Sequence, residues 1–228
     1  MDTSTYIVIS LGGSIMVPDE IDLGFLTAFT SLIKEYIATG HRFVLITGGG
    51  KVCRKYQYAL SELTDATNKD LDWLGIYTTQ LNAQFMRLVF GDLAYEEIVT
   101  DISLFPETQK PIIVGAGHKP GASTDLNAVR AAEKTGAKKV INLSNIEYAY
   151  DKDPKKFPDA VRIEQSSWAD FRKILPVEWS PGLNAPFDPI AAEMAESLGL
   201  EVAIMDGKNI ENLRNYLDGK LFIGSVIK

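Results

Sequence analysis

The stretch RFVLITGGGKVCRKY, residues 42–56, joins an apolar run to three consecutive glycines and then to a helical segment with basic side chains. The apolar run is continuous, which predicts a strand buried on both faces of a parallel sheet. Three glycines in a row lose much chain entropy on folding, which suggests that something approaches their backbone closely. A phosphate at the N-terminus of the next helix, supported by Arg54, explains the pattern. A helix-start loop with a solvated basic face is the alternative.

The same order of apolar run, loop and helical pattern recurs along the chain. Between the runs, apolar residues repeat with helical spacing from Leu23 to Ile37, from Leu74 to Phe90, and around Ala128, Met194 and Leu213. Alternating strands and helices predict a mainly parallel sheet covered on both faces. The other apolar runs are TYIVISL (5–11), PIIVG (111–115), KKVINL (138–143), LEVAIM (200–205) and KLFIGSVI (220–227).

The bulk composition narrows the class of protein. A chain of 228 residues with no long linker or repeat predicts one domain, residues 1–228, with two lobes that meet near Gly136. A net charge of −7 argues against a sequence-independent nucleic-acid partner. Cys53 is the only cysteine and there are two histidines, which disfavours a disulfide or a zinc site. No apolar run approaches the roughly 18 residues of a membrane helix, and no signal peptide is evident, so we expect a cytoplasmic protein without a membrane partner.

Three further loops follow predicted strands. SLGGS (10–14) offers glycines for an anion nest, although a tight turn gives the same sequence. GAGHKPGASTD (115–125) ends in hydroxyl and carboxylate side chains that either cap a helix or help to hold an anion. INLSNIEYAYDKDP (141–154) is consistent with a ligand loop or with a polar turn. Because the carboxyl ends of parallel strands share one edge of a sheet, all four loops should open on one crevice.

The joint pattern of motifs resembles the amino-acid-kinase superfamily over nearly the whole chain. The motifs are SLGGS, TGGGKVCRKY, DWLGIYTTQLNA (72–83), PGASTD, SNIEYAYDKDP and DPIAAEMA (188–195). Within that superfamily the pattern is most similar to the archaeal-type uridylate (UMP) kinases. The resemblance implies a three-layer αβα sandwich, carbamate-kinase-like, with residues 1–136 on the phosphate-acceptor side and residues 137–228 on the ATP side. It also implies that the γ-phosphoryl group of ATP passes to UMP, in pyrimidine nucleotide synthesis, with Mg²⁺ accompanying ATP in a homo-oligomer, a hexamer.

The resemblance also assigns residues to each substrate, with no metal ligand among the side chains. Because the UMP phosphate is already an anionic nucleophile near neutral pH, no strong base is needed. Our hypothesis is that Lys51, Arg54 or Lys119 supplies the catalytic positive charge. The residues implied to contact ATP are Gly13, Ser14, Gly50, Arg54, Ser144, Asn145, Tyr150 and Asp153. Those implied to contact UMP are Gly49, Asp72 at the ribose, His118, Lys119, Pro120, Gly121, Ala122, Ser123 and Thr124.

The sequence departs from the family pattern at three places. Ser10 stands where many superfamily members carry a lysine before the first glycine turn. Glu147 and Tyr148 replace the usual Asp-Gly pair, so the tyrosine either alters the loop, fills part of the nucleotide pocket or points to solvent. GAG at 115–117 replaces the commoner GG-x. These departures keep two alternatives open: a kinase of the same fold with another acceptor, and a nucleotide-binding paralogue that senses or stores ligand without turnover.

Overall fold

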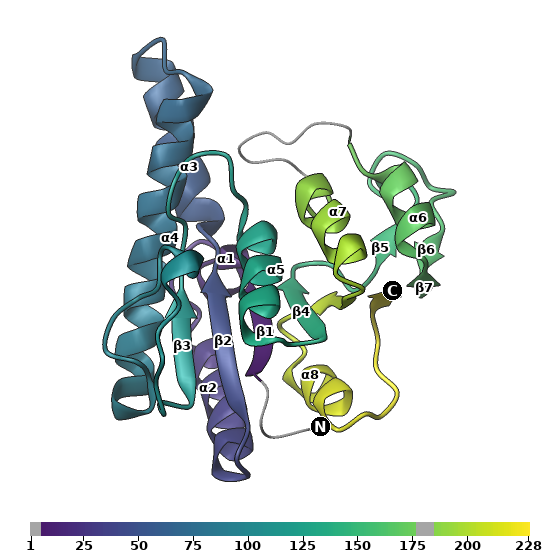
Figure 1. Cartoon of the computed structure of the whole chain (residues 1–228). Helices are drawn as coiled ribbons and strands as arrows, with labels where there is room; N and C mark the ends of the chain where they lie inside the picture. The colour runs from purple at the N-terminus through teal and green to yellow at the C-terminus, as the bar shows by residue number, and fades with distance from the viewer. Residues whose placement is uncertain (1–5, 177–184) are drawn as a thin grey trace.

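The central feature of the fold is a seven-stranded sheet. A computed structural model describes residues 6–176 and 185–228 of the chain. The strands lie in the order β3-β2-β1-β4-β8-β9-β7 (Figure 1). The first five of these run parallel, β9 is antiparallel to β8, and β7 is parallel to β9, which confirms the mainly parallel sheet. The bounds are β1 Tyr6–Leu11, β2 Arg42–Thr47, β3 Ile112–Gly115, β4 Lys139–Ser144, β7 Gln165–Ser166, β8 Glu201–Asp206 and β9 Ser225–Ile227.

The helices alternate with the strands in the predicted order. Short side chains define where they begin: Asp22 caps α2, Ser123 caps α5 and Asp188 caps α7, each by accepting from a backbone N–H. The bounds are α1 Gly13–Met16, α2 Leu23–Ala38, α3 Gly50–Leu63, α4 Asn68–Phe90, α5 Thr124–Thr135, α6 Trp168–Phe171, α7 Pro189–Ser197 and α8 Ile210–Leu217. Short 3-10 turns are η1 Gly91–Leu93, η2 Ile102–Leu104 and η3 Arg172–Ile174.

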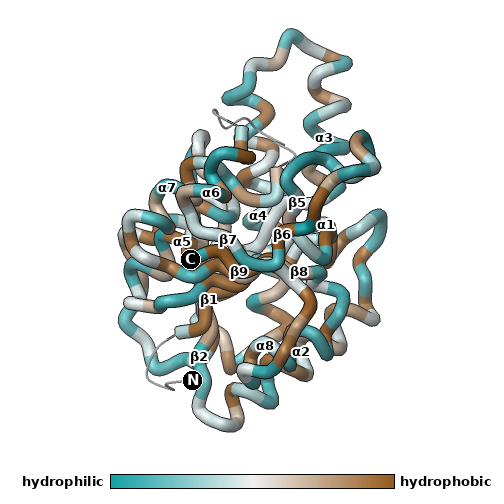
Figure 2. The backbone as a smooth tube through the Cα atoms, turned by 90° about the vertical axis from the view of Figure 1, so that its right-hand side faces the viewer, coloured by the Kyte–Doolittle hydropathy of each residue, from teal (hydrophilic) through white to brown (hydrophobic). Residues whose placement is uncertain are grey.

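Two hydrophobic cores lie on opposite faces of the sheet, because neighbouring residues of a strand point in opposite directions. Ile9 of β1 packs in one core with α2, α4 and α8, whereas Val8 packs in the other with α5, α6 and α7. Both side chains are fully buried. Figure 2 shows hydrophobic segments gathered at the centre, around β1 and β9. The molecule is therefore the three-layer αβα sandwich that the resemblance implied.

The structure differs from the sequence prediction in two elements. The long central helix begins at Asn68 rather than at Leu74, because Thr67 and Asp70 form a capping box nearly two turns earlier. The predicted strand 220–227 is wrong in its first half, and only β9 is extended within the sheet. Before it, the backbone N–H and C=O of Ile223 pair with the side-chain amide of Asn212, at 2.6 and 2.7 Å, instead of with another strand.

The segment after β4 forms a separate two-stranded sheet, which the apolar runs of the sequence did not predict. Strands β5 (Ala149–Tyr150) and β6 (Arg162–Ile163) pair antiparallel. The side chain of Tyr148 lies under the guanidinium of Arg162, at 5.1 Å from the ring centroid. The family-departing tyrosine is thus part of this hairpin, outside the pocket described below.

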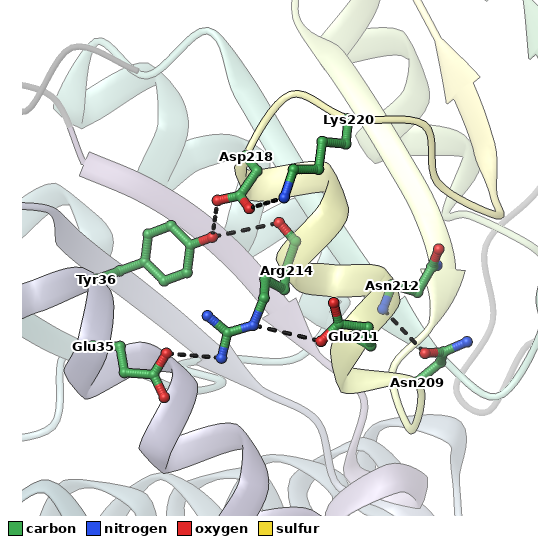
Figure 3. Close-up of polar contacts among 8 residues, drawn as sticks. All are labelled: Glu35, Tyr36, Asn209, Glu211, Asn212, Arg214, Asp218 and Lys220. Atoms are coloured by element: carbon green, nitrogen blue, oxygen red, sulfur yellow. Dashed lines mark hydrogen bonds and ion pairs between the residues drawn. The ribbon is translucent and has the colours of Figure 1, made fainter.

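The sheet runs without a break across the predicted lobe boundary. Gly136 ends α5 in the left-handed conformation, and β4, which follows it, pairs directly with β1. Polar contacts also join α2 to α8 (Figure 3): the hydroxyl of Tyr36 donates to Asp218 at 2.6 Å, and Arg214 pairs with Glu35 at 2.7 Å. The division into lobes at residue 136 stays a prediction.

Candidate active site

A cavity of about 350 Å³ opens at the carboxyl ends of β1 and β4. The strand order reverses between these two strands, which is where open α/β sheets bind their ligands. All four loops picked out from the sequence contribute to its lining, as expected from their position after parallel strands. The predicted residues that line it are Gly13, Ser14, Gly49, Gly50, Arg54, Asp72, Ala122, Ser123, Thr124, Ser144 and Asn145.

The two glycine loops, after β1 and after β2, pack closely against each other in the lining of the cavity. A Cβ on Gly13 would lie 2.4 Å from both the carbonyl oxygen of Gly48 and the backbone nitrogen of Gly50. Gly50 itself has a φ of +68°, a conformation that other residues rarely adopt. Glycine is therefore required at both positions because the backbones of the two loops pack against each other. The sequence alone predicted a close approach but did not show that the other loop makes it. Their backbone still lines the cavity.

Arg54 connects the second glycine loop to the first. It lies one turn after the start of α3, and its guanidinium donates a hydrogen bond to Ser14 Oγ at 2.9 Å. Both side chains line the cavity, so one cation stands where the two loops and the N-terminal end of α3 meet. This combination favours a phosphate group at that place.

The loop between β3 and α5 is fastened to α4 by three hydrogen bonds. The backbone N–H of Gly121 donates to Asp72 Oδ2 at 2.7 Å. Gly117 donates its N–H to Thr79 Oγ1 at 2.9 Å and accepts from the Gln80 side chain at 2.9 Å. Burial raises the pKa of Asp72, while the Gly121 N–H opposes that effect. Asp72 is therefore a buried acceptor that faces the cavity from the α4 side.

A group of buried polar residues forms the deep end of the cavity. Asp125 Oδ1 accepts from Ser10 Oγ at 3.1 Å and from Asn142 Nδ2 at 2.7 Å, and its Oδ2 accepts from the backbone N–H of Asp188 at 3.2 Å. The Asp125 carboxyl is surrounded by protein atoms, although the cavity still gives solvent some access to the residue. This burial, together with repulsion from Asp188, raises the pKa of Asp125 to about 6.

Two oxygens at this end lack a partner. Among the described residues, neither Ser144 Oγ nor Asp188 Oδ2 has a hydrogen-bond partner, and both atoms are buried. Asp188 uses its other oxygen to cap α7, accepting from Ile190 and Ala191 at 2.6 and 2.8 Å. These two oxygens beside the cavity are available to pair with a ligand or with water.

Several predicted residues lie outside the cavity lining. Lys51 pairs with Asp19 at 2.9 Å and is half exposed. His118 lies 3.6 Å from Asp101 and lines a different cavity together with Lys119. The others are Pro120, Gly121, Tyr150 on β5, and Asp153, which accepts from the backbone of Lys155 at 2.9 Å in a turn.

Ser10, Asn142 and Asp188 also line the cavity, although the sequence predicts no ligand contact for them. Ser10 and Asn142 interrupt otherwise apolar strands and are buried, which is the signal that could have identified them. For Asp125 the sequence leaves open a helix cap or a role near a bound anion; Ser123 provides the cap, so the Asp125 carboxyl is free to face the cavity. The remaining additions to the lining are Gly12, Ile15, Gly48, Cys53, Gln57, Gly75, Ile76, Thr79, Gly117, Asn127, Leu143, Ala185, Pro186 and Phe187.

The described residues contain no ready-made metal cluster. Across 6–176 and 185–228, no three His, Cys, Asp or Glu side chains are grouped so that they could hold a metal ion. In the same ranges, none of the helices has the length and apolar character that spanning a bilayer requires.

Comparisons with known proteins agree with this geometry. The model of the amino acid kinase family matches residues 5–206. The chain is 34% identical to the uridylate kinase of Methanospirillum hungatei, over 97% of this chain and 94% of that protein, and 32% identical to that of Thermococcus kodakarensis, over 94% and 96%. It superimposes on the crystal structure of uridylate kinase from Archaeoglobus fulgidus with a TM-score of 0.81 at 29% identity, covering 98% of this chain and all of that one.

Proposed function

Because this chain belongs to the amino acid kinase family, we propose that it is a uridylate kinase, which transfers the γ-phosphoryl group of ATP to UMP and gives UDP and ADP. The relatives that match nearly its whole length carry that name, and so does a structure with the same fold. The protein is on this basis an ATP-dependent phosphotransferase that acts on a nucleoside monophosphate.

One observation supports the proposal most: a single cavity is lined both by residues expected at ATP and by residues expected at UMP. At one end are Ser144 and Asn145, after β4, and at the other are Asp72 and the hydroxyls of Ser123 and Thr124. The glycine loops and Arg54 lie with them in the same lining. We assign the β4 end to ATP and the Asp72 end to UMP, so that the phosphates of both nucleotides meet at the glycine loops.

The reaction depends on holding the two nucleotides in line and on neutralising the charge of their phosphates, more than on a general base. The UMP phosphate is the nucleophile, and the γ-phosphorus of ATP is transferred to one of its oxygens while ADP leaves. Backbone N–H groups of the glycine loops and the Arg54 guanidinium would carry the developing charge. Asp72 would accept from the ribose hydroxyls, exchanging or sharing its bond to Gly121, and so fix the acceptor in line.

Mg²⁺ is the metal that we propose for this site, carried with ATP. Mg²⁺ prefers oxygen ligands and is commonly bound by one or two carboxylates together with substrate phosphates. The unpartnered oxygen of Asp188 and the carboxyl of Asp125 line the cavity, so the residues present fit such an ion, although sequence analysis assigned no side-chain ligand. When bound, the metal would neutralise charge on the phosphates.

We also propose that the chain forms a homo-oligomer, with the hexamer expected from the resemblance as its state. The outer face of α4 supports this proposal, because Tyr77, Leu81 and Leu88 are each at least 60% exposed and follow one another at helical spacing. A second copy that covers this face would remove those side chains from water. A cytoplasmic location and the part in pyrimidine synthesis stay predictions.

The test is ADP release from ATP and Mg²⁺ with UMP, CMP, AMP, carbamate and acetylglutamate supplied separately. Turnover with UMP alone is the expected result. Turnover with another acceptor alone would support the alternative kinase, and nucleotide binding without turnover of any acceptor would support the sensor or storage alternative.

A further inference from the structure

A second cavity, of about 240 Å³, lies against the loop that carries His118 and Lys119. It is bounded by that loop, by the η2 turn and by α5. Its lining residues are Thr100, Asp101, Ile102, Ser103, His118, Lys119, Ala122, Asn127 and Arg130. Ala122 and Asn127 also line the first cavity, so the two cavities share a wall.

Basic side chains outnumber acidic ones in the lining of this cavity, although the chain has a net charge of −7. Lys119 and Arg130 form no ion pair with any residue in the described ranges. The lining contains a single carboxylate, Asp101, which lies 3.6 Å from His118 and whose Oδ1 accepts from the backbone N–H and the hydroxyl of Ser103 at 2.9 and 2.7 Å. This one carboxylate stands against the two cations Lys119 and Arg130. The site therefore holds more positive charge than its own residues neutralise.

A buried donor without an acceptor is the second observation. Asn127 is only 3% exposed, and its Nδ2 is buried with no partner among the described residues. Arg130 follows it three positions later on α5, which places both side chains on one face of the helix. An unmet buried amide donor costs stability, and an acceptor that enters the cavity would remove that cost.

We propose that this cavity binds a phosphate group, either as inorganic phosphate or as part of a small phosphorylated molecule. A phosphate has several acceptor oxygens, which suits a guanidinium fork, an ammonium and an amide that surround one space. The proposed kinase reaction places both nucleotides in the first cavity, and it assigns no ligand to Asp101, Ser103 or Arg130 of the second. His118 and Lys119, for which the resemblance implies a contact with UMP, line this second cavity.

The experiment is calorimetric titration of inorganic phosphate into the protein whose first cavity is already saturated with UMP and a non-hydrolysable ATP analogue. One additional phosphate should bind per chain. Arg130→Gln should weaken that binding at least tenfold. Lys134→Gln, which removes the same charge from an exposed position on the last turn of α5, should change it less than twofold.

Further arms separate the possible outcomes. Ribose 5-phosphate in place of inorganic phosphate shows whether the site prefers an esterified group, and tighter binding of either supports the proposal. Arg54→Ala should leave the second-site binding intact, whatever its effect on the first cavity, so a failure of the kinase proposal stays distinguishable. If Arg130→Gln does not fold, Arg130→Lys and the phosphate-induced NMR shift of the Asn127 side-chain amide replace it. Absence of binding to the saturated protein, or equal loss in Arg130→Gln and Lys134→Gln, would overturn the proposal.

Discussion

The backbone N–H of Gly121 donates to the Asp72 carboxylate at 2.7 Å, across 49 positions of the chain. This is one of the three hydrogen bonds that connect α4 to the loop between β3 and α5, at the end of the cavity that we assign to UMP. The same carboxylate was expected at the ribose from the resemblance alone. The structure adds that Asp72 holds the loop as well as facing the cavity.

Replacing Asp72 should weaken the binding of UMP without changing the binding of ATP. In Asp72→Asn the ribose hydroxyls lose a charged acceptor, and hydrogen bonds to charged groups contribute about 1.5–3 kcal/mol. We expect KM for UMP to rise about tenfold or more, with KM for ATP nearly constant, in steady-state kinetics. Asp65→Asn, an exposed change just before α4, is the control. An equal rise in both KM values would contradict the assignment.

The same carboxylate should contribute a pH dependence to folding stability. Its pKa is raised in the folded protein, mainly by burial, so its contribution to stability is complete below the unfolded value of 3.8 and is lost as pH rises through the folded value. The stability of the wild type relative to Asp72→Asn should therefore fall progressively as the pH rises above the unfolded value. Urea unfolding of both proteins across this range measures the difference, and a constant difference would exclude the raised pKa.

Arg54 should be needed for the chemical step. Arg54→Ala removes the cation that bridges to Ser14, and the loss of one such electrostatic group lowers kcat by about 10²-fold. Lys55→Ala is the matched control, because Lys55 is exposed on the next position and only 3.9 Å from Asp19. Single-turnover measurements separate chemistry from product release. A loss in Lys55→Ala as large as that in Arg54→Ala would indicate a general charge effect.

Gly13 should tolerate no side chain. In Gly13→Ala the new methyl would lie 2.4 Å from backbone atoms of Gly48 and Gly50, so one loop must move. We expect a loss of about 1–3 kcal/mol in unfolding free energy, together with weaker ATP binding. Gly24→Ala, in the first turn of α2, meets only the Asp22 side chain at 3.6 Å and should be neutral or stabilising. Thermal and urea unfolding measure both variants.

The exposed face of α4 should mediate self-association. Leu81→Glu places a charge among apolar side chains and should shift the protein to smaller assemblies in sedimentation velocity. Glu62→Gln, at an exposed position on α3, controls for a surface change. If Leu81→Glu leaves the wild-type distribution unchanged, α4 is not the interface.

Local sequence signals predicted most of the elements, because apolar periodicity and capping residues act over short distances. β2, the glycine loop after it and α3 follow directly from residues 42–56. The absence of the predicted strand at 220–224 depends instead on a distant residue. The side chain of Asn212, on α8, forms hydrogen bonds with the backbone N–H and C=O of Ile223, which are therefore not paired with a strand. Likewise, Tyr148 belongs to a hairpin through Arg162, a contact that no local pattern indicates.

The sequence by itself determined the αβα class, the family and the four loops that share one sheet edge, since these depend on the order and periodicity of residues. Only the tertiary structure decided which members of those loops meet. It brings Ser10, Asn142, Asp125 and Asp188 together at the deep end of the cavity, although up to 178 positions separate them. It also places Lys51, His118 and Lys119, which were expected at the site, outside the lining of the first cavity. The physical reason is that side-chain direction and pairing between distant strands are set by packing, which a linear pattern does not contain.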